Sequence, residues 1–390
     1  MVSSVKVLLV IDSLAPGGTE ISTVALVPHL RELGIDTTIV TLKRAEHELV
    51  AEARAAGITV RRLKPARFDR RLRELRALIR SERADVVHTT LFDADQLGRV
   101  AAWGTGVPVV SSLVNTPYDR ERLADPNVAA WKVRILQLVD GVTGRFMVNS
   151  FHAVSDSTKR ANARSLRISS ERIIVAERGR DAGALGEPSA VRRQRVREHL
   201  GVATTAPVLL NVGRQDHQKG QLDLLVAARL VARQHPDLVV LIAGREGAST
   251  ESLRRAVADD AIDARLLGHR TDVGDLLCAA DALVISSRTE GASGVAIEAM
   301  ALGTPIISTA VTGLESILED GRTALLTPVA DPVALARTIQ RLLADHALAA
   351  ALGAAGRVEF ERRFTLATAA QSMARLYRQV ATPPARSAGS

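Results

Sequence analysis

Two glutamates lie eight positions apart in one short segment of the chain, Glu290-Gly-Ala-Ser-Gly-Val-Ala-Ile-Glu298. The apolar run 282–286 before them predicts a buried strand, and a helical pattern follows from about 293 to 302. We therefore expect Glu290 in a loop and Glu298 inside an otherwise apolar helix. A carboxylate there is costly to bury unless hydrogen-bond donors reach it, and the vicinal hydroxyls of a polyol are the simplest donors.

The start of the same predicted helix is suited to an anion. The first backbone N–H groups of a helix have no partner within the helix, so they favour a phosphate. Gly291, Ala292 and Ser293 lie at this start. A diol and a phosphate held one turn apart describe a nucleotide.

A second segment, Gly213-Arg-Gln-Asp-His-Gln-Lys-Gly220, follows the predicted strand 208–212. Its glycine spacing matches neither the Walker loop nor the dinucleotide fingerprint. It does place Arg214 and Lys219 at the end of a strand, where two cations can meet a diphosphate. Two solvent-exposed surface cations are the alternative interpretation.

Two features of the N-terminal half are also candidates for a site. Gly17 and Gly18 join the first predicted strand to the first long helix, so a ligand can approach the backbone closely there, although a tight turn alone also explains them. His88 ends the apolar run 84–88 at a strand terminus. A histidine satisfied inside the core is the alternative for His88.

The elements that must position these residues alternate along the chain. Strand patterns at 5–11, 36–42, 84–88 and 108–113, with a helix at 19–33, predict a doubly wound parallel sheet. The alternation restarts at 208, and 390 residues favour two domains. The predicted parts are a first domain at 1–183, a linker at 184–190, a second domain at 191–364, a helix at 365–380 that crosses back to the first domain, and a disordered tail at 381–390. Within the first domain, after the strand at 108–113, helical patterns from about 126 to 139 and a strand at 146–148 are also predicted.

The segment from Glu290 to Glu298, with the Ala-Met-Ala-Leu-Gly-Thr-Pro-Ile-Ile-Ser that follows it, resembles the E-x7-E signature of retaining glycosyltransferases with the GT-B fold, and family 4 in particular. The resemblance covers nearly the whole chain. It implies two Rossmann-like doubly wound parallel-sheet domains that face each other across a cleft. The N-terminal domain would bind an acceptor, and the C-terminal domain a nucleotide-sugar.

The resemblance also implies roles for the candidate residues. Glu290 would contact the donor sugar, Glu298 the ribose diol, and Arg214 and Lys219 the pyrophosphate. Gly17 and Gly18 would lie over the donor phosphate and the acceptor, and His88 would contact the transferred sugar. The backbone of Gly291, Ala292 and Ser293 would address sugar hydroxyls or phosphate. Glu290, His88, Arg214 and Lys219 form the expected catalytic group, and no metal or other cofactor is expected.

The chain departs from the family pattern at two places. Before the predicted linker it has Ala176-Glu-Arg-Gly-Arg-Asp181, where relatives commonly carry Pro-Asn-Gly-(Val/Ile)-Asp. After Glu290-Gly it has Ala292-Ser293, where many relatives have a large aromatic residue. Both changes concern sugar and acceptor specificity. Arg178 and Arg180 at the first departure hint at an anionic ligand.

The predicted function is retaining transfer of a sugar from a nucleotide-diphosphate sugar, with UDP favoured, to a hydroxyl acceptor such as a glycan, a lipid or a small metabolite. A nucleotide-sugar 2-epimerase on the same fold is the alternative enzyme. A basic surface-binding protein without catalysis is the alternative outside enzymes, and it predicts that substituting Glu290 or Glu298 has no effect.

The chain is basic, with 51 Lys and Arg against 43 Asp and Glu. Ten of the cations lie between Arg61 and Arg83, in a segment whose leucines recur at helical spacing. The preferred interpretation is the solvated face of an amphipathic helix; weak contact with an anionic membrane comes second, and no nucleic-acid partner is expected because aromatic residues are few. No run approaches the ~20 apolar residues of a membrane span, so we expect a cytoplasmic protein, peripheral at the inner membrane face in the second interpretation.

Overall fold

The computed structural model describes residues 4–15, 17–43, 48–118, 129–258, 262–291 and 293–382. Contacts divide the chain into two compact units, one made of the residues up to Gly179 and those from Leu366 onward, the other of Arg180–Thr365. The division thus precedes the predicted boundary at 183, and the predicted linker at 184–190 lies inside the second unit. The predicted linker begins within a short helix, α8 (Ala182–Leu185), which Asp181 caps by accepting from the Gly183 and Ala184 N–H groups. This helix packs on helices of the second unit, and it therefore belongs to that unit.

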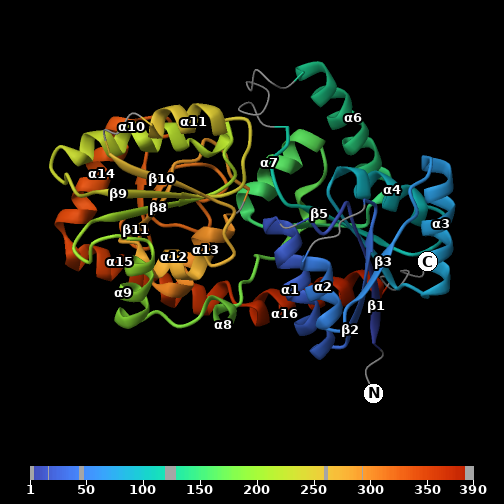
Figure 1. The fold of residues 1–390 in the computed structure, drawn as a ribbon. Coiled ribbons are helices and arrows are strands. Elements are labelled where there is room, and N and C mark those ends of the chain that lie inside the picture. Colours follow the sequence, from blue (N-terminus) through green and yellow to red (C-terminus); the bar gives the residue numbers. More distant parts are fainter. Residues whose placement is uncertain are drawn as a thin grey trace. The chain divides into compact units, whose positions relative to one another are not determined.

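The first unit is built on a parallel sheet. Within the described residues it has seven strands in the order β3-β2-β1-β4-β5-β6-β7 (Figure 1). All residues of the central strands β4 and β5 are buried, as expected for a parallel sheet covered on both faces. The strands are β1 (Val5–Ile11), β2 (Ile35–Thr41), β3 (Thr59–Arg62), β4 (Val86–Thr90), β5 (Val109–Leu113), β6 (Ser150–Ala153) and β7 (Ile173–Val175).

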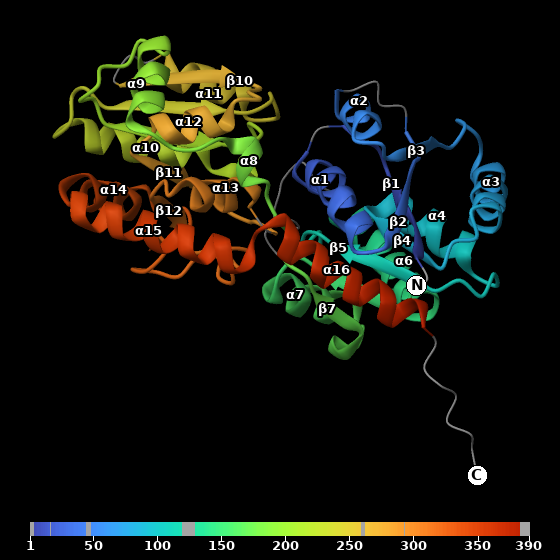
Figure 2. The ribbon, with the colours of Figure 1, turned by 90° about the horizontal axis from the view of Figure 1, so that it is seen from below.

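Two groups of helices cover this sheet. On one face α1 contacts both α2 and the C-terminal helix α16, and on the other α3, α4, α6 and α7 contact one another in sequence (Figures 1 and 2). Their bounds are α1 (Gly18–Glu32), α2 (Glu48–Ala55), α3 (Phe68–Ser81), α4 (Phe92–Ala102), α6 (Ala130–Met147), α7 (Asp156–Leu166) and α16 (Leu366–Ala381).

Helix α16 belongs to the core of the first unit although it lies at the other end of the sequence. It buries Met373, Leu376 and Tyr377 against Val7 of β1 and Val86 of β4. Figure 2 shows α16 lying along α1. The helix predicted at 365–380 therefore completes the first unit.

Helix α6 differs from its prediction. The expected helical pattern at 126–139 begins outside the described residues, and the helix continues to Met147, through the strand predicted at 146–148. That strand prediction was wrong, because a short apolar run cannot by itself be told from the end of a helix. Asp140 and Gly144, one turn apart, are the residues of α6 that reach the core.

The second unit holds another parallel sheet. In the described part of the chain it has six strands in the order β10-β9-β8-β11-β12-β13. The strands are β8 (Val208–Val212), β9 (Val239–Ala243), β10 (Asp263–Gly268), β11 (Ala282–Ile285), β12 (Ile306–Thr309) and β13 (Leu325–Thr327). Its helices besides α8 are α9 (Ala190–His199), α10 (Gln221–Ala232), α11 (Thr250–Val257), α12 (Val273–Ala279), α13 (Gly294–Leu302), α14 (Pro332–Ala344) and α15 (His346–Arg363).

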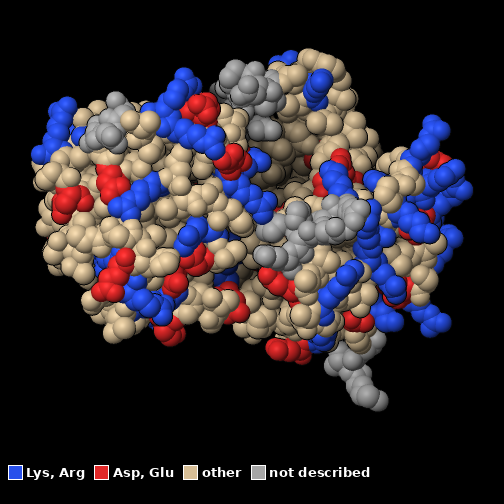
Figure 3. Space-filling view, in the orientation of Figure 1, with Lys and Arg blue, Asp and Glu red and all other residues tan. Residues whose placement is uncertain are grey.

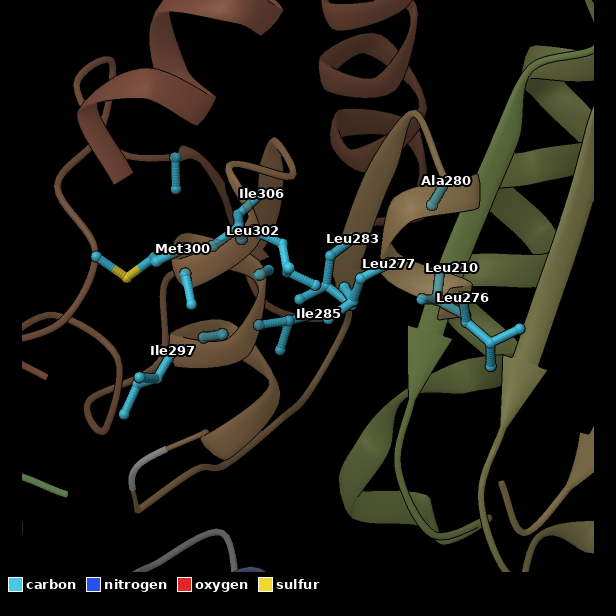
Figure 4. Close-up of a cluster of buried hydrophobic side chains, with 14 of the residues drawn as sticks. Leu210, Leu276, Leu277, Ala280, Leu283, Ile285, Ile297, Met300, Leu302 and Ile306 are labelled. Carbon is cyan, nitrogen blue, oxygen red and sulfur yellow. The ribbon is translucent and has the colours of Figure 1, made fainter. Parts of the chain in front are cut away.

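The core of the second unit fixes helix α13. Ile297, Met300 and Leu302 pack into one buried cluster with Leu283 of β11 and Ile306 of β12 (Figure 4). Most of the residues of this helix are buried. A polar residue on α13 is therefore held in a rigid setting. None of the helices in the described ranges has the length and apolar character needed to cross a bilayer.

Candidate active site

Glu298 lies in the middle of α13, as predicted, but its partner is a cation. Its Oε1 accepts a hydrogen bond from Arg180 Nε at 2.8 Å. The side chains of Glu298 and Arg180 are 19% and 8% exposed. The cost of placing a carboxylate among apolar residues is thus offset within the protein, without the polyol that the sequence suggested.

The backbone holds Arg180 in place. Its N–H donates to the Phe364 carbonyl oxygen at 2.8 Å. Its guanidinium lies so close to Gly294 that a Cβ at that position would be 1.8 Å from Arg180 Nη2. Glycine at 294 therefore allows the guanidinium to lie against the first turn of α13, one turn from Glu298. The sequence linked Arg180 to an anionic ligand and did not pair it with Glu298, which lies far from it along the chain.

Glu290 has its own cation. Lys219 Nζ lies 2.5 Å from Glu290 Oε1, and Ser287 Oγ donates to the same oxygen at 2.8 Å. The Glu290 side chain is 8% exposed and that of Lys219 24%. Each of the two predicted carboxylates therefore lies beside one cation of the second unit.

A close backbone approach brings Lys219 to Glu290. Lys219 ends a short 3-10 turn, and Gly220 follows with a φ of +59°. A Cβ on Gly220 would lie 2.0 Å from the Ser286 carbonyl oxygen at the end of β11, so only glycine fits there. Arg214, on the same loop, is 67% exposed and pairs with Asp216. The structure thus unites Lys219 with Glu290, while Arg214 contacts neither predicted carboxylate in the interactions described.

The first turn of α13 has neither a side-chain cap nor an acidic residue. The N-cap of the helix is Ser293, whose side chain makes no capping hydrogen bond. The backbone N–H groups of this turn are therefore suited to an anionic ligand. Gly291 is described, whereas Ala292, the other predicted backbone contact, lies outside the described residues.

Gly17 and Gly18 begin helix α1 in the first unit. Gly17 is the N-cap, with an extended φ of −149°, so its conformation does not require glycine. Arg178 Nη2 donates to Thr19 Oγ1 at 2.8 Å in the first turn. Arg178, which the sequence linked to an anionic ligand, thus lies beside the glycine pair.

His88 is satisfied within the core of the first unit. It is 4% exposed, with Nδ1 2.6 Å from Tyr377 Oη and Nε2 2.7 Å from Ser112 Oγ. Ser112 Oγ also lies 2.8 Å from His152 Nδ1. Burial, with repulsion from His152, lowers the pKa of His88 to about 3, so the ring is neutral near pH 7. Both ring nitrogens of His88 thus have partners inside the first unit, as the alternative of a histidine satisfied in the core expects. The contact of His88 with a sugar stays a prediction.

The histidine network forms one wall of a small cavity in the first unit. The cavity holds about 60 Å³ and is lined by residues of β4, β5 and β6, of the helices α1 and α16, and of the segment 176–179. Polar lining residues include Thr19, Ser112, His152 and Arg178. Tyr377, Ser112 and His152 come from separate parts of the sequence, so no local motif could have grouped them. In the described ranges, no group of three His, Cys, Asp or Glu side chains is placed to bind a metal ion.

Comparisons with known proteins identify the family. The model described as "Glycosyl transferase 4-like domain" matches residues 17–179, and "Glycosyl transferases group 1" matches 206–345. The D-inositol 3-phosphate glycosyltransferase of Xylanimonas cellulosilytica is 33% identical over 308 residues, which are 76% of this chain and 72% of that relative. The chain belongs to glycosyltransferase family 4. It is a glycosyltransferase, as predicted, and the matches do not favour the 2-epimerase alternative.

Other relatives of this glycosyltransferase agree. The D-inositol 3-phosphate glycosyltransferase of Thermobispora bispora is 28% identical over 393 residues, covering 93% of this chain and 89% of the relative. The crystal structure of Anabaena HepE with UDP and glucose has a TM-score of 0.85 at 20% identity, covering 96% of this chain and all of that one. Sucrose-phosphate synthase from Thermosynechococcus elongatus has a TM-score of 0.78 at 22% identity, covering 96% and 99%. With the two parallel α/β sheets, these similarities confirm the predicted GT-B fold.

Proposed function

We propose that this glycosyltransferase takes a sugar from a UDP-sugar bound at the second unit and transfers it to a hydroxyl group with retention of configuration and without a metal ion. The observation that carries the proposal is the pair of carboxylates, Glu290 in the loop before α13 and Glu298 in the middle of that helix, each of which lies beside a cation. Glu298 would accept from the ribose diol and Glu290 from hydroxyls of the donor sugar.

The cations support the departure of the nucleotide. Breaking the anomeric C–O bond leaves negative charge on the diphosphate, and Lys219, Arg214 and the first-turn N–H groups of α13 are the groups that would stabilise it. Lys219 already lies 2.5 Å from Glu290, so one side chain can link the sugar and the diphosphate. Arg214 is 67% exposed and can turn toward a ligand.

The similar proteins suggest the donor and the acceptor to test first. HepE, which has the same fold, has been crystallised with UDP-glucose. Several curated relatives are D-inositol 3-phosphate glycosyltransferases. UDP-sugars are therefore the first donors, and a phosphorylated polyol such as D-inositol 3-phosphate is the first acceptor.

The test is an assay of transfer from UDP-glucose and UDP-N-acetylglucosamine to D-inositol 3-phosphate in EDTA, with the anomeric configuration of the product read by NMR. We expect an α-linked product from an α-linked donor, undiminished by EDTA and abolished in Glu290→Gln. A β-linked product would refute retention, and activity restored only by added divalent metal would refute metal independence. An isomerised nucleotide-sugar formed without acceptor would instead support the 2-epimerase.

A further inference from the structure

Helix α6 exposes a row of large apolar side chains. Seven of them are exposed on its 18 residues, with Trp131, Leu138 and Phe146 at 63%, 67% and 73%. The others are Ile135, Leu136, Val139 and Val142. Single exposed apolar residues are ordinary on protein surfaces, whereas a contiguous row marks a contact surface.

The row occupies one side of the helix. At about 100° per residue, Trp131, Ile135, Leu138, Val142 and Phe146 fall within an arc of about 80° and extend over about 22 Å. We call these five residues the α6 stripe. The buried residues of the helix, Asp140 and Gly144, lie on the opposite side by the same geometry. One side of α6 therefore packs against the core of the first unit, and the stripe lies on the side that faces away from the core.

The stripe continues beyond the end of the helix. Trp103, which follows α4, is 64% exposed and lines the same hollow of about 430 Å³ as Phe146. Trp103 and Trp131 are the two tryptophans of the chain. Both are thus exposed, one at each end of the apolar surface, and tryptophan is the residue that favours the boundary between lipid and water.

Among the described residues of α6, the charged side chains beside the stripe are cationic. Lys132 and Arg134 flank its first turn and Arg145 its last. The structure describes every residue of α6, and Asp140 is its one acid. Asp140 is buried, and its Oδ1 lies 2.6 Å from Arg99 Nη1. The neighbouring helix α7 adds Lys159, Arg160 and Arg164 against Asp156. Figure 3 shows the visible side of α6 as mostly uncharged, with scattered blue cations.

This charge pattern decides what can cover the stripe. A symmetric contact between two copies would place the cations of α6 against the same cations, with no exposed acid on either helix to offset them. An anionic lipid surface offers both hydrocarbon for the stripe and negative headgroups for the flanking cations. We propose that α6 docks the enzyme on an anionic membrane, lying in the headgroup layer with the stripe inserted.

The proposal moves the membrane contact away from the basic segment 61–83. The apolar side of α3 is used by the core, where Leu75 and Ile79 are buried. The solvent side of α3 is therefore charged and has no apolar face to insert into a bilayer. It can contribute only long-range electrostatic attraction between the protein and an anionic membrane. Helix α6 supplies the apolar area that membrane binding needs.

The test is flotation of the full chain with vesicles of phosphatidylcholine alone or with about one third phosphatidylglycerol. We expect flotation with the anionic vesicles and a blue shift of tryptophan emission, since both tryptophans are on the docking surface. Leu138→Glu should reduce binding by at least about tenfold. The matched control is Val358→Glu, which adds the same charge at a residue 65% exposed on α15.

Other outcomes overturn the proposal. Wild type that does not float with anionic vesicles contradicts it directly. Equal losses in Leu138→Glu and Val358→Glu would show that net charge alone governs binding. A dimer in light scattering that Leu138→Glu converts to a monomer, with vesicle binding unchanged, would assign the stripe to a second copy. Thermal unfolding of both variants confirms that they fold.

Discussion

At the scale of single residues, the donor site depends on how a buried carboxylate is held. Arg180 Nε lies 2.8 Å from Glu298 Oε1 and fixes the orientation of that carboxylate. We predict that Arg180→Leu weakens UDP binding by about tenfold, because an oriented acceptor for the ribose diol is lost. The same variant should discriminate less between UDP and 2′-deoxy-UDP, measured by calorimetry.

A control separates this role from general stability. Arg192 forms a comparable ion pair with Asp275 in the same unit, at 2.7 Å. Arg192→Leu should leave the discrimination unchanged. If Arg180→Leu keeps the full preference for UDP over 2′-deoxy-UDP, Arg180 does not position Glu298 for the ribose.

The neutral histidines of the first unit predict a pH dependence. Burial lowers the pKa of His88 to about 3 and of His152 to about 4, from an ordinary value of 6.5. As the pH falls, these histidines are protonated in the unfolded chain before they are protonated in the folded protein. Their contribution to the free energy of unfolding is therefore complete above pH 6.5 and decreases as the pH drops toward 4. His88→Gln should make the thermal unfolding temperature less sensitive to pH between about 6.5 and 4. An unchanged pH profile would show that His88 titrates alike in both states.

At the scale of elements, α15 carries a charge cluster whose contribution to stability is also lost on acidification, but in a lower pH range. Hydrogen bonds from Arg362 and Arg363 lower the pKa of Glu359 to about 2, and its side chain is 5% exposed. Its contribution is present above about pH 4.5 and is lost as the pH falls to about 2. Because Arg362 is largely exposed and its charge is screened by water, Glu359→Gln should destabilise the second unit by about 1 kcal/mol at pH 7 and by much less at pH 2. A stability difference that stays constant with pH would contradict the assignment.

Local patterns were sufficient for elements whose ends are marked. The strand before Glu290 and the helix containing Glu298 lie where the sequence places them, because an apolar run, a glycine-rich loop and a second apolar run give clear limits. Helix α6 could not be bounded in this way, since its core side consists of Asp140 and Gly144 rather than apolar residues. In the sequence, the apolar residues of the exposed stripe have the same helical spacing as residues that face a core.

The sequence predicted some residues of the candidate site and not others. Glu290, Glu298, Lys219 and Arg214 belong to motifs with recognisable spacing. Their partners do not, because Arg180 is far from Glu298 in the sequence and meets it only in the folded second unit. The Tyr377 partner of His88 likewise depends on α16 joining the first unit.

At the scale of the whole molecule, the chain is two compact units with separate cores. Met373 of α16 is 3% exposed and packs in the first unit. Met373→Ala should therefore lower the free energy of unfolding of the first unit by about 2–5 kcal/mol. Differential scanning calorimetry should show that Met373→Ala lowers the unfolding temperature of one transition, that of the first unit. UDP should raise the unfolding temperature of the other transition, that of the second unit. Equal shifts of both transitions by either change would contradict separate units.

The most direct measurement of the central claim is calorimetric titration of UDP into wild type and Glu298→Ala, in EDTA. A nucleotide site at α13 predicts saturable binding to wild type, and at 100 times the dissociation constant a stabilisation of about 2.7 kcal/mol. The same titration of Glu298→Ala should show binding weakened beyond detection. Absence of binding to wild type, or equal affinity in the variant, would contradict the assignment of Glu298 to the donor nucleotide.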